Sequence, residues 1–140
     1  MKVVIINGPN LNLLGIREPQ LYGHQTWNDF FKVLQNRFPE IELSCFQSNV
    51  EGELVNYIQS AQDCDAGILN PGAYAHTSLA IADALKAIKT PFIEVHITHV
   101  FSREPERHVL KSAACCRGTI SGFGLEGYAM ALAHWAQHKV

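Results

Sequence analysis

Short apolar runs alternate with helical stretches along the chain, and this alternation limits the possible folds more than any other feature of the sequence. Short apolar runs bounded by turn signals predict buried strands. The five predicted strands are residues 3–6, 41–46, 66–69, 92–97 and 119–121.

Helical patterns fill the spaces between these runs. Thr26 is a suitable cap for a helix that continues to about Arg37, because its hydroxyl can accept a hydrogen bond from a free backbone amide. Residues 51–63 place apolar side chains on one face, and residues 78–88 are rich in alanine. A last helix is predicted over residues 125–138.

This order of elements predicts a parallel sheet with helices on both faces and right-handed crossovers. We therefore expect an α/β fold, a flavodoxin-like three-layer sandwich with a five-stranded parallel sheet. The 140 residues contain no internal repeat or low-complexity linker, so a single domain over residues 1–140 is expected. The connections 8–25 and 98–118 are too long to be simple turns.

Charge and composition narrow the choice of partner. The net charge is -2 with both signs interspersed, which argues against a nucleic-acid backbone or a membrane surface as partner. No apolar run approaches the roughly 20 residues of a membrane span, and no signal peptide precedes the first strand. A cytoplasmic protein with a small-molecule partner is expected. The four cysteines lack CxxC or zinc spacing and are expected to be reduced and structural.

Polar residues follow each of the first four predicted strands. In open α/β sheets, ligands bind beyond the carboxyl ends of the strands. Each polar group taken singly also suits an ordinary turn or helix cap, but the four together favour a polyhydroxylated ligand. These segments are Asn7-Gly-Pro-Asn10, Gln47-Ser-Asn49, Asn70-Pro-Gly-Ala73 and His96-Ile-Thr98.

Two motifs could suggest a cofactor or a metal ion, but neither has the sequence context that such a site requires. Gly122-Phe-Gly124-Leu-Glu-Gly127 matches GxGxxG, but the helix after it ends the chain and no later strand can supply an acidic residue for a ribose, so a tight strand-to-helix turn is expected. His96 and His99 are three apart and do not share a face of a strand. The first turn also lacks phosphate-cradling glycines. No cofactor and no metal are expected.

Arg17 and Tyr22 lie in the first long connection and suggest a general base. The ordinary pKa of a phenol, near ~10, is too high for a base at neutral pH, but a nearby guanidinium favours the phenolate. A tyrosine that only packs on its neighbours, with an arginine in water, is the alternative reading of the same pair.

Glu94 and His96 are two apart on the fourth predicted strand and therefore point to the same face. A carboxylate beside an imidazole orients the ring and favours its protonated form, which makes His96 a candidate general acid, although strand histidines are often structural. A base can remove an acidic proton next to a carbonyl, and an acid can protonate a departing hydroxyl. Together they suit the elimination of water through an enolate. Asn10 could polarise the enolate oxygen.

Ordered motifs along nearly the whole chain resemble the type II 3-dehydroquinate dehydratases. They are Ile6-Asn-Gly-Pro-Asn-Leu-Asn-Leu-Leu-Gly15, Arg17-Glu-Pro, Tyr22-Gly23, Ile68-Leu-Asn-Pro-Gly72, His76-Thr-Ser78, Ile93-Glu-Val-His-Ile97, Arg103-Glu104 and Ile120-Ser-Gly-Phe-Gly124. The resemblance implies elimination of water from 3-dehydroquinate to 3-dehydroshikimate without a cofactor, in aromatic biosynthesis or in quinate breakdown.

The resemblance also assigns roles to individual residues. It implies Tyr22 as the base at C2, Arg17 as the group that stabilises its phenolate, and His96, oriented by Glu94, as the acid at the C1 hydroxyl, with Asn10 supporting the enolate. The implied substrate-binding groups are Asn70, His76, Arg107, the backbone amides of Ile97 and Thr98, and Asp83 supplied by a neighbouring subunit. The family's assembly, a dodecamer of four trimers, is implied with it.

The second long connection departs from the family pattern. Thr98 and His99 stand where Ser-Asn is usual, Glu106 stands where an aromatic residue is common, and residues 109–111 replace a His-Ser-Tyr-like stretch. Arg103 is therefore a possible substitute for Arg107. Two other functions remain open at this point: a non-catalytic small-molecule binding protein of flavodoxin-like fold, and a different hydro-lyase or hydrolase that acts on another cyclic polyol acid.

Overall fold

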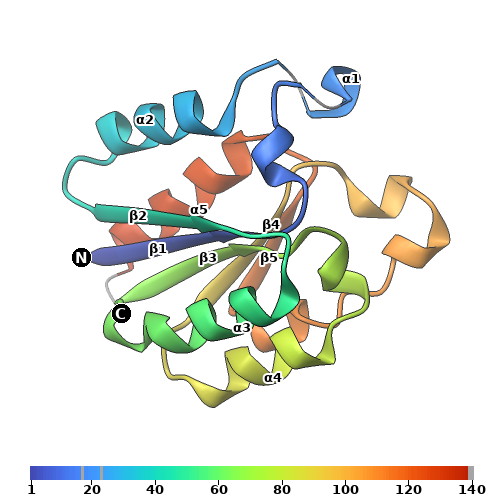
Figure 1. The fold of residues 1–140 in the computed structure, drawn as a ribbon. Coiled ribbons are helices and arrows are strands. Elements are labelled where there is room, and N and C mark those ends of the chain that lie inside the picture. The colour runs from blue at the N-terminus through green and yellow to red at the C-terminus, as the bar shows by residue number, and fades with distance from the viewer. Residues whose placement is uncertain (17, 23, 139–140) are drawn as a thin grey trace.

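The structure, a computed structural model, describes residues 1–16, 18–22 and 24–138, with the side chains of Leu21 and Tyr22 left out. Five strands form one sheet in the order β2-β1-β3-β4-β5, and every neighbouring pair is parallel (Figure 1). This is the flavodoxin-like order, so the predicted fold class is confirmed. The strands are β1 (Lys2–Asn7), β2 (Glu42–Gln47), β3 (Ala66–Asn70), β4 (Phe92–His96) and β5 (Gly118–Ser121).

The long helices agree with the predicted segments to within a few residues. Thr26 caps α2 (Trp27–Arg37), since its hydroxyl accepts a 3.2 Å hydrogen bond from the backbone amide of Asp29. The helix predicted over residues 51–63 was too long, because α3 ends at Ser60. The last three residues of the predicted segment, Ala61–Asp63, form a 3-10 turn instead. The other helices are α1 (Pro19–Tyr22), α3 (Glu51–Ser60), α4 (Leu79–Ala87) and α5 (Glu126–Gln137).

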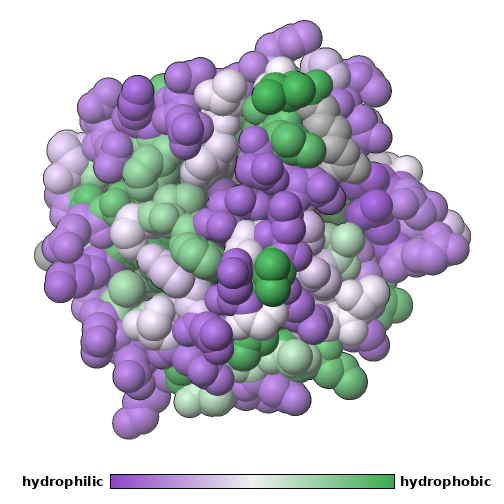
Figure 2. All heavy atoms as spheres, in the orientation of Figure 1, coloured by the Kyte–Doolittle hydropathy of each residue, from purple (hydrophilic) through white to green (hydrophobic). Residues whose placement is uncertain are grey.

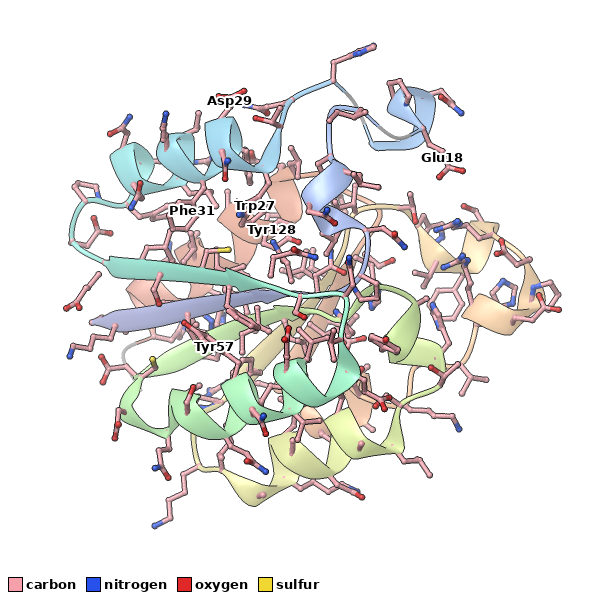
Figure 3. The ribbon with its side chains drawn as sticks, in the orientation of Figure 1. Glu18, Trp27, Asp29, Phe31, Tyr57 and Tyr128 are labelled. Atoms are coloured by element: carbon pink, nitrogen blue, oxygen red, sulfur yellow. The ribbon has the colours of Figure 1, made fainter. Side chains whose placement is uncertain are left out.

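Helices cover the sheet in two layers: α2 and α5 lie on one face, and α3 and α4 lie on the other (Figure 1). In the first layer Trp27 of α2 points toward Tyr128 of α5, with ring centroids 4.9 Å apart (Figure 3). In the second, Tyr57 of α3 stacks on Phe46 of the edge strand at 4.0 Å. The face turned to the viewer is mostly hydrophilic, with a paler apolar band where β2 runs between α2 and α3 (Figure 2).

The carboxyl ends of all five strands point to one edge of the sheet, and both long connections lie beyond it (Figure 1). The first connection contains a 3-10 turn and the short helix α1, and the second contains three 3-10 turns; neither was predicted. Strand order reverses beside β1, where ligands of open α/β sheets bind. Within the described residues, no helix is long and apolar enough to span a membrane.

Candidate active site

A pocket opens at the carboxyl ends of β1, β3 and β4 and brings together most of the residues that the sequence singled out. The predicted residues that line it are Asn10, Asn70, His76, His96, Ile97, Thr98 and Arg107. Arg103, the possible substitute for Arg107, lines it as well. Arg17 lies outside the described residues, and so does the side chain of Tyr22. The structure therefore bears on the predicted acid and binding groups but not on the predicted base.

Glu94 and His96 form the buried pair that their spacing predicts. The Nε2 atom of His96 lies 2.7 Å from Oε1 of Glu94, and the two side chains are 6% and 0% exposed. Because a carboxylate only accepts, Nε2 carries the hydrogen and Nδ1 is the ring nitrogen left for other partners. Glu94 itself lies behind the imidazole and outside the pocket lining. Its second oxygen, Oε2, accepts a 2.6 Å hydrogen bond from the hydroxyl of Ser112.

His76 stands beside His96, with the two ring centroids 6.2 Å apart. Its Nδ1 lies 2.9 Å from the backbone oxygen of Val109, so Nδ1 donates, and a neutral ring offers Nε2 as an acceptor. Burial lowers the pKa of His76, and the charges of His96 and Arg107 lower it further, against the opposing effect of the Val109 hydrogen bond. His76 is therefore suited to accept a hydrogen bond from a ligand hydroxyl.

The glycine-rich turn between β5 and α5 orients two backbone amides. The amide of Gly122 donates to the carbonyl of His96 at 3.1 Å, and the amide of Gly124 donates to the carbonyl of Ile97 at 2.9 Å. In a trans peptide the N–H points away from the C=O, so the amides of Ile97 and Thr98 face away from this turn. Within the described part of the chain, neither amide donates a hydrogen bond. Two adjacent free amides suit an anion.

These glycines do what the sequence predicted, since Gly122 and Gly124 have φ values of 95° and 60°. Such left-handed backbone favours glycine, so the motif is a tight turn from strand to helix. Its consequence for Ile97 and Thr98 was not predicted.

Asn70 lines the pocket at the end of β3, and hydrogen bonds to Tyr128 and Gly72 hold its side chain in place. Its Nδ2 donates a 2.8 Å hydrogen bond to the hydroxyl of Tyr128, and its Oδ1 accepts one from the amide of Gly72 at 3.2 Å. The Tyr128 hydroxyl in turn donates to Oδ1 of Asn7 at 2.9 Å. These partners fix which end of the Asn70 amide is nitrogen and leave its second N–H for a ligand.

Asn10 and the two arginines come from the long connections. Asn10 has a left-handed backbone with φ of 69°, and its amide donates a 3.0 Å hydrogen bond to Oδ1 of Asn49. Arg107 donates from Nε to Oε1 of Glu104 at 2.6 Å, and Nε of Arg103 lies 3.9 Å from Oε2 of the same carboxylate. The hydrogen bond from Arg107 is the main cause that lowers the pKa of Glu104. Both arginines therefore face the pocket beside one shared, exposed carboxylate.

Asp83 is exposed on α4 and does not line the pocket of its own chain. Sequence reasoning missed two supporting residues, Ser112 and Tyr128. Neither belongs to a motif, and each acts on a partner far away along the chain. Among the residues that the structure describes, no three or more His, Cys, Asp or Glu side chains form a group suited to a metal ion.

Comparisons with known proteins agree with this geometry. The family model described as dehydroquinase class II matches residues 1–136. A 3-dehydroquinate dehydratase from Clostridium perfringens is 47% identical over 142 aligned positions, which cover 99% of this chain and 97% of the relative. The crystal structure of type II dehydroquinase from Butyrivibrio crossotus superposes with a TM-score of 0.94 at 42% identity and covers 97% of each chain. The structure of type II dehydroquinase from Propionibacterium acnes gives a TM-score of 0.93 at 38% identity, over 98% of this chain and 97% of the other.

Proposed function

This chain belongs to the class II dehydroquinase family, and from that premise we propose that it eliminates water from 3-dehydroquinate to give 3-dehydroshikimate. The observation that carries the proposal is the buried Glu94–His96 pair at a pocket that also holds the free amides of Ile97 and Thr98. The pocket would thus place an acid for a leaving hydroxyl beside a binding site for a carboxylate. The substrate 3-dehydroquinate carries both a hydroxyl and a carboxylate on C1.

The elimination proceeds in two proton transfers. The Tyr22 phenolate, stabilised by Arg17, takes a proton from C2, and the electrons of the C–H bond move to the C3 carbonyl to form an enolate supported by Asn10. The enolate then collapses into a C1–C2 double bond as His96 gives its proton to the C1 hydroxyl, which leaves as water. The cycle closes when a proton passes from Tyr22 to His96 through solvent. The roles of Tyr22 and Arg17 come from the family resemblance and from their closeness in the sequence of the first long connection.

The binding groups match the functional groups of the substrate. The amides of Ile97 and Thr98 hold the carboxylate, because adjacent N–H donors in a pocket replace the water that an anion loses. The remaining N–H of Asn70, the free Nε2 of His76 and the guanidinium of Arg107 bind the hydroxyl groups. Each of these side chains lines the pocket, which supports the assignment.

The position of Asp83 supports a site that is shared between subunits. This side chain is exposed and lies outside its own pocket, so a role in substrate binding requires a second copy of the chain. Leu79, four residues earlier on the same helical face, is 64% exposed, and an exposed leucine beside Asp83 supports a protein contact. The dodecamer of four trimers, built from single domains of residues 1–140, is the assembly that the family resemblance implies, and it would supply that second copy. The cytoplasmic location and the absence of a cofactor remain predictions from the sequence.

Shared sites can be tested by complementation. Asp83→Ala and Tyr22→Phe are each expected to have little activity, because each removes one group of the same site. If a neighbour supplies Asp83, unfolding and refolding the two variants together restores part of the activity, since some hybrid sites carry both intact groups. Size-exclusion chromatography with light scattering gives the subunit number. No recovery in a mixed oligomer would contradict a shared site.

The reaction itself is tested by ultraviolet absorbance, because the product is a conjugated enone and the substrate is not. We expect a rising signal with wild-type protein and 3-dehydroquinate, and almost none with Tyr22→Phe, which still binds substrate in calorimetry. Chelators and borohydride should leave the rate unchanged, since the proposed steps use neither a metal nor an imine. A flat signal from folded wild-type protein that binds the substrate would instead favour a non-catalytic binding protein.

A further inference from the structure

We propose that Ser112 is a positioning residue that holds the acid His96 in place by acting through Glu94. The inference rests on the proposed function, because it concerns the step in which His96 protonates the leaving hydroxyl. Ser112 does not line the pocket and belongs to none of the motifs that carry the family resemblance.

Among the described residues, each oxygen of the Glu94 carboxylate accepts a hydrogen bond from one side chain. The Ser112 hydroxyl donates to Oε2 at 2.6 Å, and Nε2 of His96 donates to Oε1 at 2.7 Å. Ser112 and Glu94 are 0% exposed and His96 is 6% exposed, so water does not take the place of either donor. The last torsion of a glutamate side chain is broad and two-fold, and a single donor leaves the carboxylate free to turn about it. The second donor removes that freedom.

The direction of these bonds determines what His96 can do. Both oxygens of the Glu94 carboxylate accept hydrogen bonds in this arrangement, so Nε2 of His96 is the donor and carries a hydrogen. The proton that leaves toward the substrate is then the one on Nδ1. Ser112 therefore fixes the ring and selects the nitrogen that reacts.

Ser112 is itself held in place by its neighbours. The amide of Lys111 donates a 2.7 Å hydrogen bond to the carbonyl of Ala75, directly before the pocket residue His76. The carbonyl of Ser112 accepts from the amide of Cys115 at 2.9 Å and from the thiol of Cys116 at 3.6 Å. The hydroxyl thus approaches Glu94 from a backbone that is anchored on both sides.

The test compares Ser112→Ala with Ser112→Thr, which keeps the hydroxyl. We expect kcat of Ser112→Ala to fall about tenfold or more with little change in KM, since the hydrogen bond that is lost involves a charged group and no group that binds substrate is removed. Exchange of the C2 proton with D2O, followed by NMR, reports enolate formation alone and should persist. Ser112→Thr should recover most of kcat. An equal loss of exchange and turnover would contradict the inference.

Thr90→Val is the matched control. Thr90 is 8% exposed, and its hydroxyl donates to the carbonyl of Ala61 at 2.9 Å, so the variant also loses a buried hydroxyl without a contact to Glu94. We expect it to lower the melting temperature while the ratio of turnover to exchange stays at the wild-type value. If Ser112→Ala does not fold, Ser112→Cys replaces it, because a thiol is a weak donor of similar volume.

A double-mutant cycle with Glu94→Gln tests whether Ser112 acts through Glu94. If it does, adding Ser112→Ala to Glu94→Gln costs much less turnover than it does in the wild type. Additive losses would contradict the inference, and so would wild-type kcat in Ser112→Ala. Either result leaves the proposed function intact, which fails only if the wild-type protein gives no dehydration.

Discussion

The hydroxyl of Tyr128 donates a 2.9 Å hydrogen bond to Oδ1 of Asn7, a residue 121 positions earlier in the chain. The same hydroxyl accepts from Nδ2 of Asn70, so one buried phenol joins α5 to the ends of β1 and β3. Burial raises the pKa of Tyr128, with an opposing effect from the Asn70 hydrogen bond, and this keeps the phenol protonated as a donor. The Asn70 amide therefore faces the pocket with a defined orientation.

Tyr128→Phe should weaken both the fold and substrate binding. It leaves polar atoms of Asn7 and Asn70 without partners in a buried region, at a cost of about 1–3 kcal/mol in the free energy of unfolding. KM should rise several-fold, because Asn70 loses the bond that orients its amide. Urea unfolding and steady-state kinetics measure the two effects. Tyr57→Phe is the control: within the described residues its hydroxyl has no hydrogen-bond partner, so both values should stay near wild type.

Gly122→Ala should raise KM about tenfold or more, because a tenfold change corresponds to the ~1.4 kcal/mol expected from disturbing one carboxylate contact. An added Cβ would lie 2.9 Å from Cβ of His99 at a φ of 95°, so the turn must shift and release the carbonyl of His96. Steady-state kinetics and calorimetric titration with substrate measure the loss. Gly52→Ala, with nothing within 4 Å of the added atom, is the matched control and should keep wild-type KM.

Arg107→Ala should raise KM about tenfold, since it removes a charged donor from the pocket. Arg103→Ala should have a smaller effect, because the guanidinium of Arg103 already contacts protein groups, among them the hydroxyl of Thr98 at 3.4 Å and the carboxylate of Glu104 at 3.9 Å. Steady-state kinetics of the two single variants separates the roles. A larger effect at Arg103 would show that it has taken over the role assigned to Arg107.

Stability should fall in mild acid, partly because of His76. Its pKa in the folded protein lies below the ordinary 6.5, so the unfolded chain binds more protons as the pH falls below that value. The contribution of His76 to the free energy of unfolding is therefore fully present above pH 6.5, and it is lost as the pH falls from there through the folded-state pKa of His76. Denaturant unfolding at about pH 7.5 and about pH 5.5 should show a smaller difference for His76→Gln than for wild type. His134, whose pKa is also lowered by burial, remains in both proteins.

Local patterns explain why the sheet and its helices could be predicted. Apolar runs, the Thr26 cap and the alanine-rich α4 each act within a few residues, and the tertiary structure agrees with them. The short α1 and the 3-10 turns of the long connections lack such patterns. The second long connection also depends on a tertiary contact, the hydrogen bond from the amide of Lys111 to the carbonyl of Ala75.

The residues of the candidate site also fall into two groups, those that a local sequence pattern predicts and those that it does not. The spacing of Glu94 and His96 on one strand determines their common face, so their contact could be predicted from sequence. Ser112 and Tyr128 could not be predicted, because they reach their partners across 18 and 58 or more positions and an isolated serine or tyrosine carries no local signal of such a contact. The turn at Gly122 and Gly124 was predicted correctly. Its role in orienting the amides of Ile97 and Thr98 could not be predicted, because that role depends on the direction of the carbonyls of His96 and Ile97.

The proposed acid, His96, depends on more of the structure than the end of β4. Glu94 is fully buried, and its carboxylate accepts a hydrogen bond from Ser112, which lies in the second long connection. A designer who grafted only Glu94 and His96 onto another five-stranded scaffold would bury the carboxyl group without the hydrogen bond that Ser112 donates. The unit that such a design must transfer is therefore β4 together with the segment that contains Ser112.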